Sequence, residues 1–279
     1  MIRHRRIAIL SLLLTLGSSI VFSANYEHEF GDDWTQAETF VREHHSEWKP
    51  IFDEFGVDVR IAEAIVFPEL IRYSHWQDAI ETATVKGVYV SGGSEKANFS
   101  IGRFQMKPSF AEKIDQEWNQ STLASEFGFM FDVRNNSDAR SSRVKRLGTI
   151  DGQCRYLAIF IRLMFLRHPK LQSLSAEQQV RFLATAYNRN HRATWQQIIA
   201  QQKRKTFHTD LLKTRHTKTY RYCEISVSSL KKNCHSSKFI FHAAEHKFQS
   251  VEHIFHVVVH KFQDAEHKIL NKRKTYLFR

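Results

Sequence analysis

The sequence has few of the residues that break or cross-link regular structure. Of its 279 residues, only 10 are glycine, 4 are proline and 3 are cysteine. This scarcity excludes collagen-like chains, low-complexity linkers and disulfide-rich miniproteins. Apolar residues make up 42% and charged residues 25% of the chain, which is typical of a protein that buries a sizeable core. The composition therefore predicts a globular, mainly α-helical protein.

Positive charge is concentrated at the two ends of the chain. The formal net charge is +12, of which Arg3, Arg5 and Arg6 supply three charges. Residues 231–279 supply six more, because they contain 10 basic and 4 acidic side chains. The residues between are nearly neutral, so the body of the protein is not expected to bind nucleic acid.

The first residues have the pattern of an export signal. The basic stretch Met1–Arg6 precedes the apolar stretch Ile7–Phe22, and we expect cleavage after Ser23 or Ala24. A membrane anchor is the alternative, although this apolar stretch is shorter than the roughly 20 residues that span a bilayer. The sequence therefore predicts an exported protein that is peripheral to the membrane at most.

The cysteines do not indicate a metal site. Cys154 lies in an apolar run, so we expect a small buried core residue rather than a nucleophile. A disulfide between Cys223 and Cys234 is one alternative for the other two. Neither the cysteines nor the histidines have the spacing of metal ligands, and no metal is predicted.

Hydrophobic spacing and capping residues predict several helices. Residues 25–56 form an amphipathic segment, and Asp58 is placed to cap the helix that follows. Residues 153–167 are apolar enough for a buried helix. Ser175 begins a capping-box pattern, and helical spacing continues from there to Asn188.

The sequence also favours a surface connection and a strand. Residues 132–148 are polar and basic, which favours a surface connection. Residues 220–227 favour a last strand.

Glu69 lies on the apolar face of the helix that Asp58 caps. Ile61, Ile65 and Glu69 are spaced by four residues, so the carboxyl group is expected on the side that faces the core and partly removed from water. Pro68 is expected to kink this helix and to place Glu69 near its end.

A nine-residue segment follows a polar, glycine-containing loop. Residues 91–100 are predicted to be this loop. The next residues are Ile101-Gly102-Arg103-Phe104-Gln105-Met106-Lys107-Pro108-Ser109, in which Pro108 is placed to begin a helix.

Three separated pieces resemble one family. Glu69, residues 101–109 and Ala186-Tyr187-Asn188 are similar in order and type to the lytic transglycosylases of the lysozyme-like superfamily. The pattern of that family is a catalytic Glu, a Gly-x-x-Gln segment that runs into Pro-Ser, and Ala-Tyr-Asn. The resemblance covers about residues 55–190. Leu70 stands where the better-known branches have Ser, so the resemblance is to a divergent branch.

The resemblance implies a fold and a reaction. It implies a helical lysozyme-like domain, with a small loop or strand region beside the cleft, that cleaves peptidoglycan glycan strands in the periplasm or cell envelope of a bacterium. Glu69 would donate a proton to the leaving oxygen, which requires a raised pKa. The C6 hydroxyl of N-acetylmuramic acid would then attack the anomeric carbon, with Glu69 as base. The product would be a 1,6-anhydromuramic acid end, and no cofactor is implied.

The resemblance also assigns binding roles by position. Gln105, Tyr187 and Asn188 match family positions that bind sugar groups or orient the Glu. Gly102 would let the backbone approach the glycan closely. The residues expected to line the cleft because they lie near the motif are Tyr89, Asn98 and Ser100.

Two other functions compete with this one. A hydrolytic muramidase would need a second carboxylate, for which the sequence offers Asp78, Glu81 and Glu95. A catalytically weak peptidoglycan-binding or scaffolding protein is the alternative from another class.

The tail repeats every seven residues. Large apolar residues occupy one position of the repeat: Phe241, Phe248, Phe255, Phe262 and Ile269. This is heptad spacing, which predicts a helix through residues 238–270 that pairs with another copy or with a partner. A surface-associating basic helix and a repeat without selected function are the alternatives. The sequence thus divides into an export signal (1–23), a catalytic domain (24–230) and a basic tail (231–279).

Overall fold

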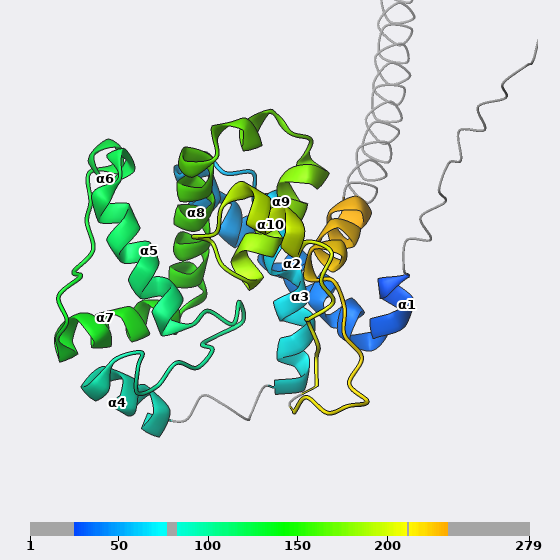
Figure 1. Cartoon of the computed structure of the whole chain (residues 1–279), viewed down its shortest axis with the longest axis horizontal. Helices are drawn as coiled ribbons and strands as arrows, with labels where there is room; N and C mark the ends of the chain where they lie inside the picture. Colours follow the sequence, from blue (N-terminus) through cyan, green and yellow to red (C-terminus); the bar gives the residue numbers. More distant parts are fainter. Residues whose placement is uncertain (1–24, 77–82, 211, 234–279) are drawn as a thin grey trace, which may run out of the picture.

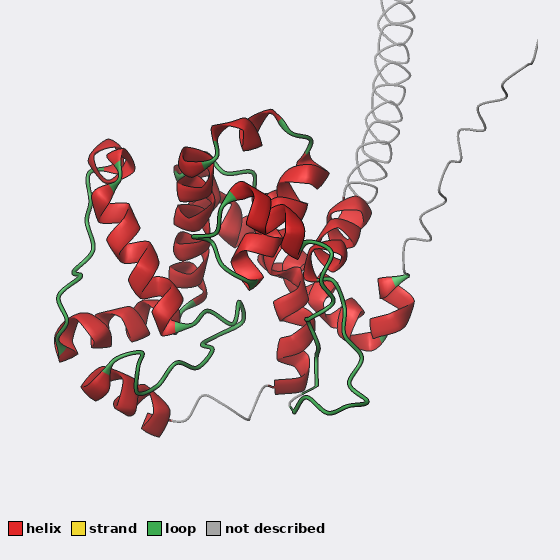
Figure 2. Cartoon of the chain, viewed as in Figure 1, coloured by secondary structure: helices red, strands yellow, loops and turns green. Residues whose placement is uncertain are grey.

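The protein is mainly helical, as predicted. The computed structural model describes residues 25–76, 83–210 and 212–233, which form the coloured part of Figure 1. Within these ranges, the only β-structure consists of isolated bridges, and Figure 2 shows helices joined by loops. The predicted export signal and heptad repeat lie outside the described residues.

The helices follow one another with short connections. In chain order they are α1 (Tyr26–Phe30), α2 (Asp32–Glu54), α3 (Val59–Trp76), α4 (Ala83–Gly92), α5 (Pro108–Gln120), α6 (Thr122–Phe127), α7 (Ser137–Leu147), α8 (Ile150–Arg167), the 3-10 helix η1 (Pro169–Ser173), α9 (Ala176–Asn188) and α10 (Trp195–Gln201). A further helix covers residues 222–233.

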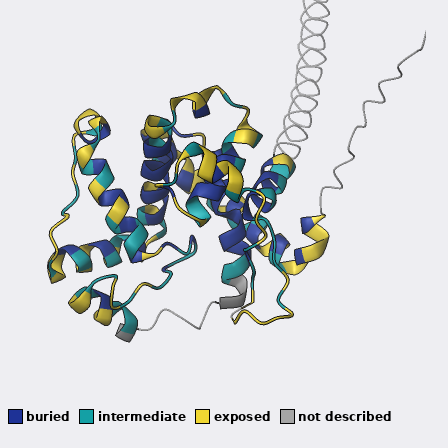
Figure 3. Ribbon diagram, viewed as in Figure 1, coloured by how far each residue is buried: buried dark blue, intermediate teal, exposed yellow. Residues whose placement is uncertain are grey.

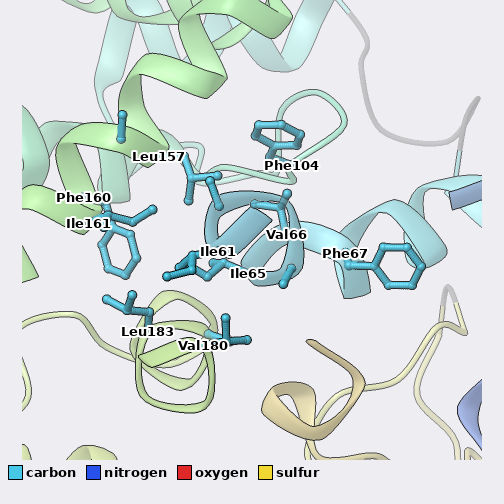
Figure 4. Close-up of a cluster of buried hydrophobic side chains, with 14 of the residues drawn as sticks. Ile61, Ile65, Val66, Phe67, Phe104, Leu157, Phe160, Ile161, Val180 and Leu183 are labelled. Carbon is cyan, nitrogen blue, oxygen red and sulfur yellow. The ribbon is translucent and has the colours of Figure 1, made fainter. Parts of the chain in front are cut away.

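Helix α3 lies at the centre of the core. Helices α2, α8 and α9 pack against it. Figure 4 shows Ile61, Ile65 and Val66 of α3 among side chains of the neighbouring helices, with Phe104 above them. The neighbours labelled there are Leu157, Phe160, Ile161, Val180 and Leu183. All these side chains are buried, so α3 is held from several sides.

A buried polar cluster joins a second group of helices. Asp115 of α5 accepts hydrogen bonds from Arg143 of α7 at 2.8 Å and from the Tyr156 hydroxyl of α8 at 2.9 Å. Arg143 also donates to the hydroxyl oxygen of Tyr89 in α4 at 2.8 Å. Helices α4 to α7 lie together at the left of Figure 1, and their inner faces are buried in Figure 3.

The prediction that Pro68 places Glu69 near the end of α3 is wrong. The helix continues through Pro68 to Trp76, although a proline removes one backbone hydrogen bond. Phe67, Leu70 and Ile71 are buried on both sides of the proline, and burial of such side chains outweighs the loss of one bond. Glu69 therefore lies inside a continuous helix.

The predicted surface connection and the predicted strand both contain helical residues. Residues 132–148 include α7. The predicted strand at 220–227 is wrong, because the helix 222–233 begins there with Tyr222, Ile225 and Leu230 buried.

The caps were predicted correctly. Asp58 accepts a hydrogen bond from the Arg60 amide at 2.9 Å, Pro108 begins α5, and Ser175 forms a complete capping box with Gln178.

The two ends of the described chain meet. Lys232 forms ion pairs with Glu27 at 2.7 Å and with Glu38 at 2.9 Å, and Lys218 pairs with Glu29 at 2.7 Å. Among the helices described, none has the length and apolar character that a bilayer span requires.

Candidate active site

Glu69 is buried inside the protein. Its side chain is 6% exposed, and its Oε2 atom lies 3.1 Å from Nη1 of Arg72. Burial raises the pKa of the carboxyl group, while the charge of Arg72, the neighbouring Tyr222 hydroxyl and the charge of Lys107 lower it; burial prevails. The pKa of Glu69 is therefore above its ordinary value, as a proton donor near neutral pH requires.

The residues next to Glu69 are fixed by contacts of their own. Arg72 donates to the His208 carbonyl oxygen at 3.1 Å and stacks on the Phe207 ring at 4.3 Å. Tyr222 donates to the Ile65 carbonyl oxygen at 3.0 Å. Arg72 and Tyr222 are thus held in place next to the Glu69 carboxyl group.

The motif segment folds into a tight turn above α3. Ile101 and Met106 exchange two backbone hydrogen bonds of 2.9 and 3.1 Å and form an isolated β-bridge. Gln105 has a φ of 51°, and it is the only described non-glycine residue with positive φ. Such backbone strain concentrates at functional sites. The Gln105 side chain donates to the Gly102 carbonyl oxygen at 2.9 Å.

Two distant side chains hold this turn through Phe104. Gln153 of α8 accepts from the Phe104 amide at 2.8 Å and donates to the Leu147 carbonyl oxygen at 2.8 Å. Tyr187 of α9 donates to the Phe104 carbonyl oxygen at 2.7 Å. Sequence reasoning missed Gln153, although a glutamine within an apolar helical run was a signal for it.

Gly102 serves the turn rather than the cleft. Its φ is +66°, and an added Cβ would lie 1.8 Å from Nε2 of Gln153. The nearest neighbour is thus a protein side chain, and Gly102 does not line the pocket. The expected close approach of this backbone to a glycan has no support in this geometry.

The three motif pieces meet at one pocket. A cavity of about 260 Å³ lies beside Glu69, and we call it the Glu69 pocket. Its lining residues are Glu69, Arg72, Ser100, Gln105, Met106, Lys107, Ser109, Phe110, Lys113, Tyr187, Asn188, Arg189, Asn190 and His191. Five residues predicted for the site are in this set, namely Glu69, Ser100, Gln105, Tyr187 and Asn188.

Two predicted cleft residues lie elsewhere. The Asn98 side chain accepts from the Ser109 amide at 3.3 Å, which fixes the start of α5. The Tyr89 hydroxyl donates to Glu112 at 2.9 Å within the polar cluster. Neither residue lines the Glu69 pocket.

His191 forms one wall of the pocket and is held from behind. Its Nε2 atom lies 3.2 Å from Glu117, and Glu117 also binds Arg167 at 2.6 Å and Arg192. Although burial raises the pKa of Glu117, hydrogen bonds from His191 and Arg192 lower it to about 2. Glu117 is therefore ionised near neutral pH, and its charge anchors this wall.

The pocket contains one carboxyl group among the described residues. Glu69 is the only acidic side chain in the described part of its lining. Of the candidates for a second carboxylate, Glu95 lines a different cavity, together with Arg134 and Arg140. Asp78 and Glu81 lie outside the described residues.

Cys154 is a buried core residue, as the sequence predicts. Cys154 is buried, and burial raises the pKa of its thiol, which suits a core residue better than a nucleophile. Cys234, the predicted partner of Cys223, is outside the described residues. In the part of the chain that is described, no group of three or more His, Cys, Asp or Glu side chains is arranged to hold a metal ion.

Comparisons of the chain with protein-family models, with curated proteins and with solved structures find no match.

Proposed function

We propose that this chain is an exported lytic transglycosylase of the lysozyme-like type, acting on peptidoglycan. It would cleave the β-1,4 bond between N-acetylmuramic acid and N-acetylglucosamine. The observation that supports this best is the meeting of Glu69, Gln105 and Tyr187-Asn188 at one pocket. These residues are separated by up to 119 positions in the sequence, so only folding brings them together.

Glu69 supplies the proton for bond cleavage. Its protonated carboxyl group donates to the glycosidic oxygen as the bond to the anomeric carbon breaks. The C6 hydroxyl of the same muramic acid then bonds to that carbon, and its proton returns to Glu69. No water is consumed, and the strand ends in a 1,6-anhydro ring. The raised pKa of Glu69 keeps the acid form available.

The polar side chains around Glu69 have distinct roles in this scheme. Tyr187 positions the motif turn through Phe104 rather than through a sugar. The Gln105 side-chain oxygen is buried and accepts no hydrogen bond from the described residues. It therefore suits a sugar hydroxyl or amide as its donor. Asn188 lines the same pocket and offers both a donor and an acceptor.

The single carboxyl group in the described lining favours internal attack over hydrolysis. Hydrolytic glycosidases use a second carboxylate as nucleophile or to activate water. A reaction in which the substrate provides its own hydroxyl does not need one.

Mass spectrometry of soluble products tests this function. The purified full chain is incubated with peptidoglycan, with Glu69→Gln alongside. We expect muropeptides lighter by one water molecule than the hydrolysed form, and none from the variant. Products with reducing ends would instead indicate a muramidase, and no product from a folded, glycan-binding chain would indicate a binding protein.

A further inference from the structure

Cations surround Glu69 in the pocket. Arg72, Lys107, Lys113 and Arg189 line it, and Glu69 is the only acidic residue of the described lining. Arg72 is already paired with Glu69 at 3.1 Å. The other three cations therefore give the pocket an excess of positive charge.

These three cations form no ion pair with the described residues. Among the described residues, no ion pair joins Lys107, Lys113 or Arg189 to an acidic side chain, and the Arg189 guanidinium donates to the neutral side-chain oxygen of Gln201 at 3.3 Å. All three residues are exposed. Their charges are thus available to a ligand.

Lys107 is placed where its charge is unfavourable for the protein. It is the N-cap residue of α5 and makes no side-chain capping bond, although the start of a helix favours anions and short acceptor side chains. Its charge also lowers the pKa of Glu69, which opposes the role of a proton donor. A side chain whose charge is locally unfavourable for the folded protein is expected at a functional position.

The cations lie on two sides of the pocket. Lys107 is the N-cap residue of α5 and Lys113 lies in the first half of that helix, whereas Arg189 is the C-cap residue of α9. An anion between these two helix ends would contact both groups.

We propose that Lys107, Lys113 and Arg189 bind a carboxylate carried by the muramic acid residue and thereby select muramic-acid-containing strands over uncharged chitin-like glycans. The proposal rests on the function proposed above. Both sugars of the strand carry an acetamido group and a C6 hydroxyl, whereas only muramic acid carries a lactyl group. The lactyl carboxylate is free in strands without peptides. In peptide-bearing strands, the stem peptide attached to the lactyl group supplies carboxylates instead.

A bound carboxylate would also affect Glu69. It offsets the positive charge of Lys107, and the pKa of Glu69 then rises further. The correct substrate would in this way favour the acid form that cleaves it.

Binding to the full chain with Glu69→Gln tests the selection without turnover. Three tetrasaccharides of equal length are compared by calorimetry: muramic-acid-containing with free lactyl groups, the same with stem peptides, and chitin tetrasaccharide. We expect about tenfold tighter binding of at least one charged form, the size that two or three exposed ion pairs contribute. The advantage should shrink as salt is added, and the two charged arms show which carboxylate is recognised.

Variants identify the cations responsible. Adding Lys107→Gln, Lys113→Gln and Arg189→Gln should remove most of the preference for charged glycans, because of the lining cations only Arg72, which does not pair with a carboxylate at position 69 in this background, keeps its charge. Lys145→Gln, at an exposed position on α7, should keep the preference. If the triple variant does not fold, each single variant should reduce the preference by about twofold. Equal affinity of the parent protein for all three glycans would overturn the proposal.

The same experiments separate the two proposals. If the wild-type chain releases anhydro products but shows no preference, the carboxylate site is wrong and the transglycosylase survives. If the preference is present but no glycan is cleaved, the transglycosylase is wrong and the carboxylate site survives.

Discussion

At the level of single residues, opposing electrostatic effects act on Glu69. Burial raises the pKa of the carboxyl group, and the charges of Arg72 and Lys107, with Tyr222, lower it. Glu69 was predictable because its four-residue spacing from Ile65 places it on the apolar face. Arg72 and Tyr222 were not assigned to the site, since Arg72 is an ordinary helical cation in the sequence and Tyr222 comes from a segment more than 150 residues away.

Replacing Lys107 should shift the pH dependence of the reaction. Lys107→Gln removes a positive charge that lowers the pKa of Glu69, so that pKa rises. Because cleavage needs the protonated acid, kcat/KM should begin to fall at a higher pH than in the wild type. The rate of anhydro-product release measured across pH checks this. Lys145→Gln is the control, and a shift to lower pH would contradict the expected sign.

Replacing Glu117 should reduce stability in a pH-dependent way. The folded-state pKa of Glu117 is about 2, below the ordinary value of 4.5. Its contribution is therefore fully present above about pH 4.5 and is lost as the pH falls through about 2. Glu117→Gln should lower the free energy of unfolding by about 2 kcal/mol near pH 7.

Urea unfolding at several pH values measures this difference. Glu126→Gln is a suitable control, because Glu126 forms an exposed pair with Arg162 that is expected to contribute less than about 1 kcal/mol. A difference between wild type and Glu117→Gln that stays constant down to pH 2 would show that the anion is not the cause.

At the level of elements, local signals predicted helix starts better than helix ends. Asp58, Pro108 and Ser175 were identified by capping chemistry that involves neighbouring residues only. The continuation of α3 through Pro68 and the helix 222–233 depend on burial against distant helices. The sequence did contain a signal for the helix 222–233, since Tyr222, Ile225 and Ser229 have helical spacing and are buried. However, tyrosine, isoleucine and valine in a short run also favour a strand.

The link from α8 to the motif turn should be essential for both stability and activity. Gln153→Leu leaves the Phe104 amide and the Leu147 carbonyl oxygen without their partner. We expect a loss of about 3 kcal/mol in the free energy of unfolding, because two buried backbone groups lose a hydrogen bond. Product release should fall as well.

Thermal unfolding and product analysis test this link together. Gln120→Leu, at an exposed position at the end of α5, controls for the change of residue type. If Gln153→Leu unfolds like the wild type, the turn is held by other contacts.

At the level of the whole molecule, the last described helix completes the site. Tyr222 lies beside Glu69 and binds the α3 backbone, and Lys232 connects the helix to α1 and α2. The meeting of the three motif pieces could be predicted, because the resemblance implies that they belong to one site. The presence of Lys113 and Arg189 at the site could not be predicted, since only the fold brings α5 and the end of α9 to one pocket. The helix also extends beyond residue 230, where the sequence placed a domain boundary.

Two truncations test the contribution of this helix. A chain ending at residue 233 keeps the contacts described, and we expect cooperative unfolding and product release. A chain ending at residue 219 loses Tyr222, Ile225 and Leu230 and uncovers α3, so we expect it to lose both. Circular dichroism during heating distinguishes the two, and equal stability would mean that the helix is dispensable.

The most direct test of internal attack assisted by Glu69 is to run the reaction in water labelled with heavy oxygen. The C6 hydroxyl of the substrate should close the ring, so the new muramic acid ends should be anhydro sugars without label, and Glu69→Gln should release none of them. Labelled reducing ends would show that water attacks the anomeric carbon, and unlabelled anhydro ends from Glu69→Gln would show that another group donates the proton.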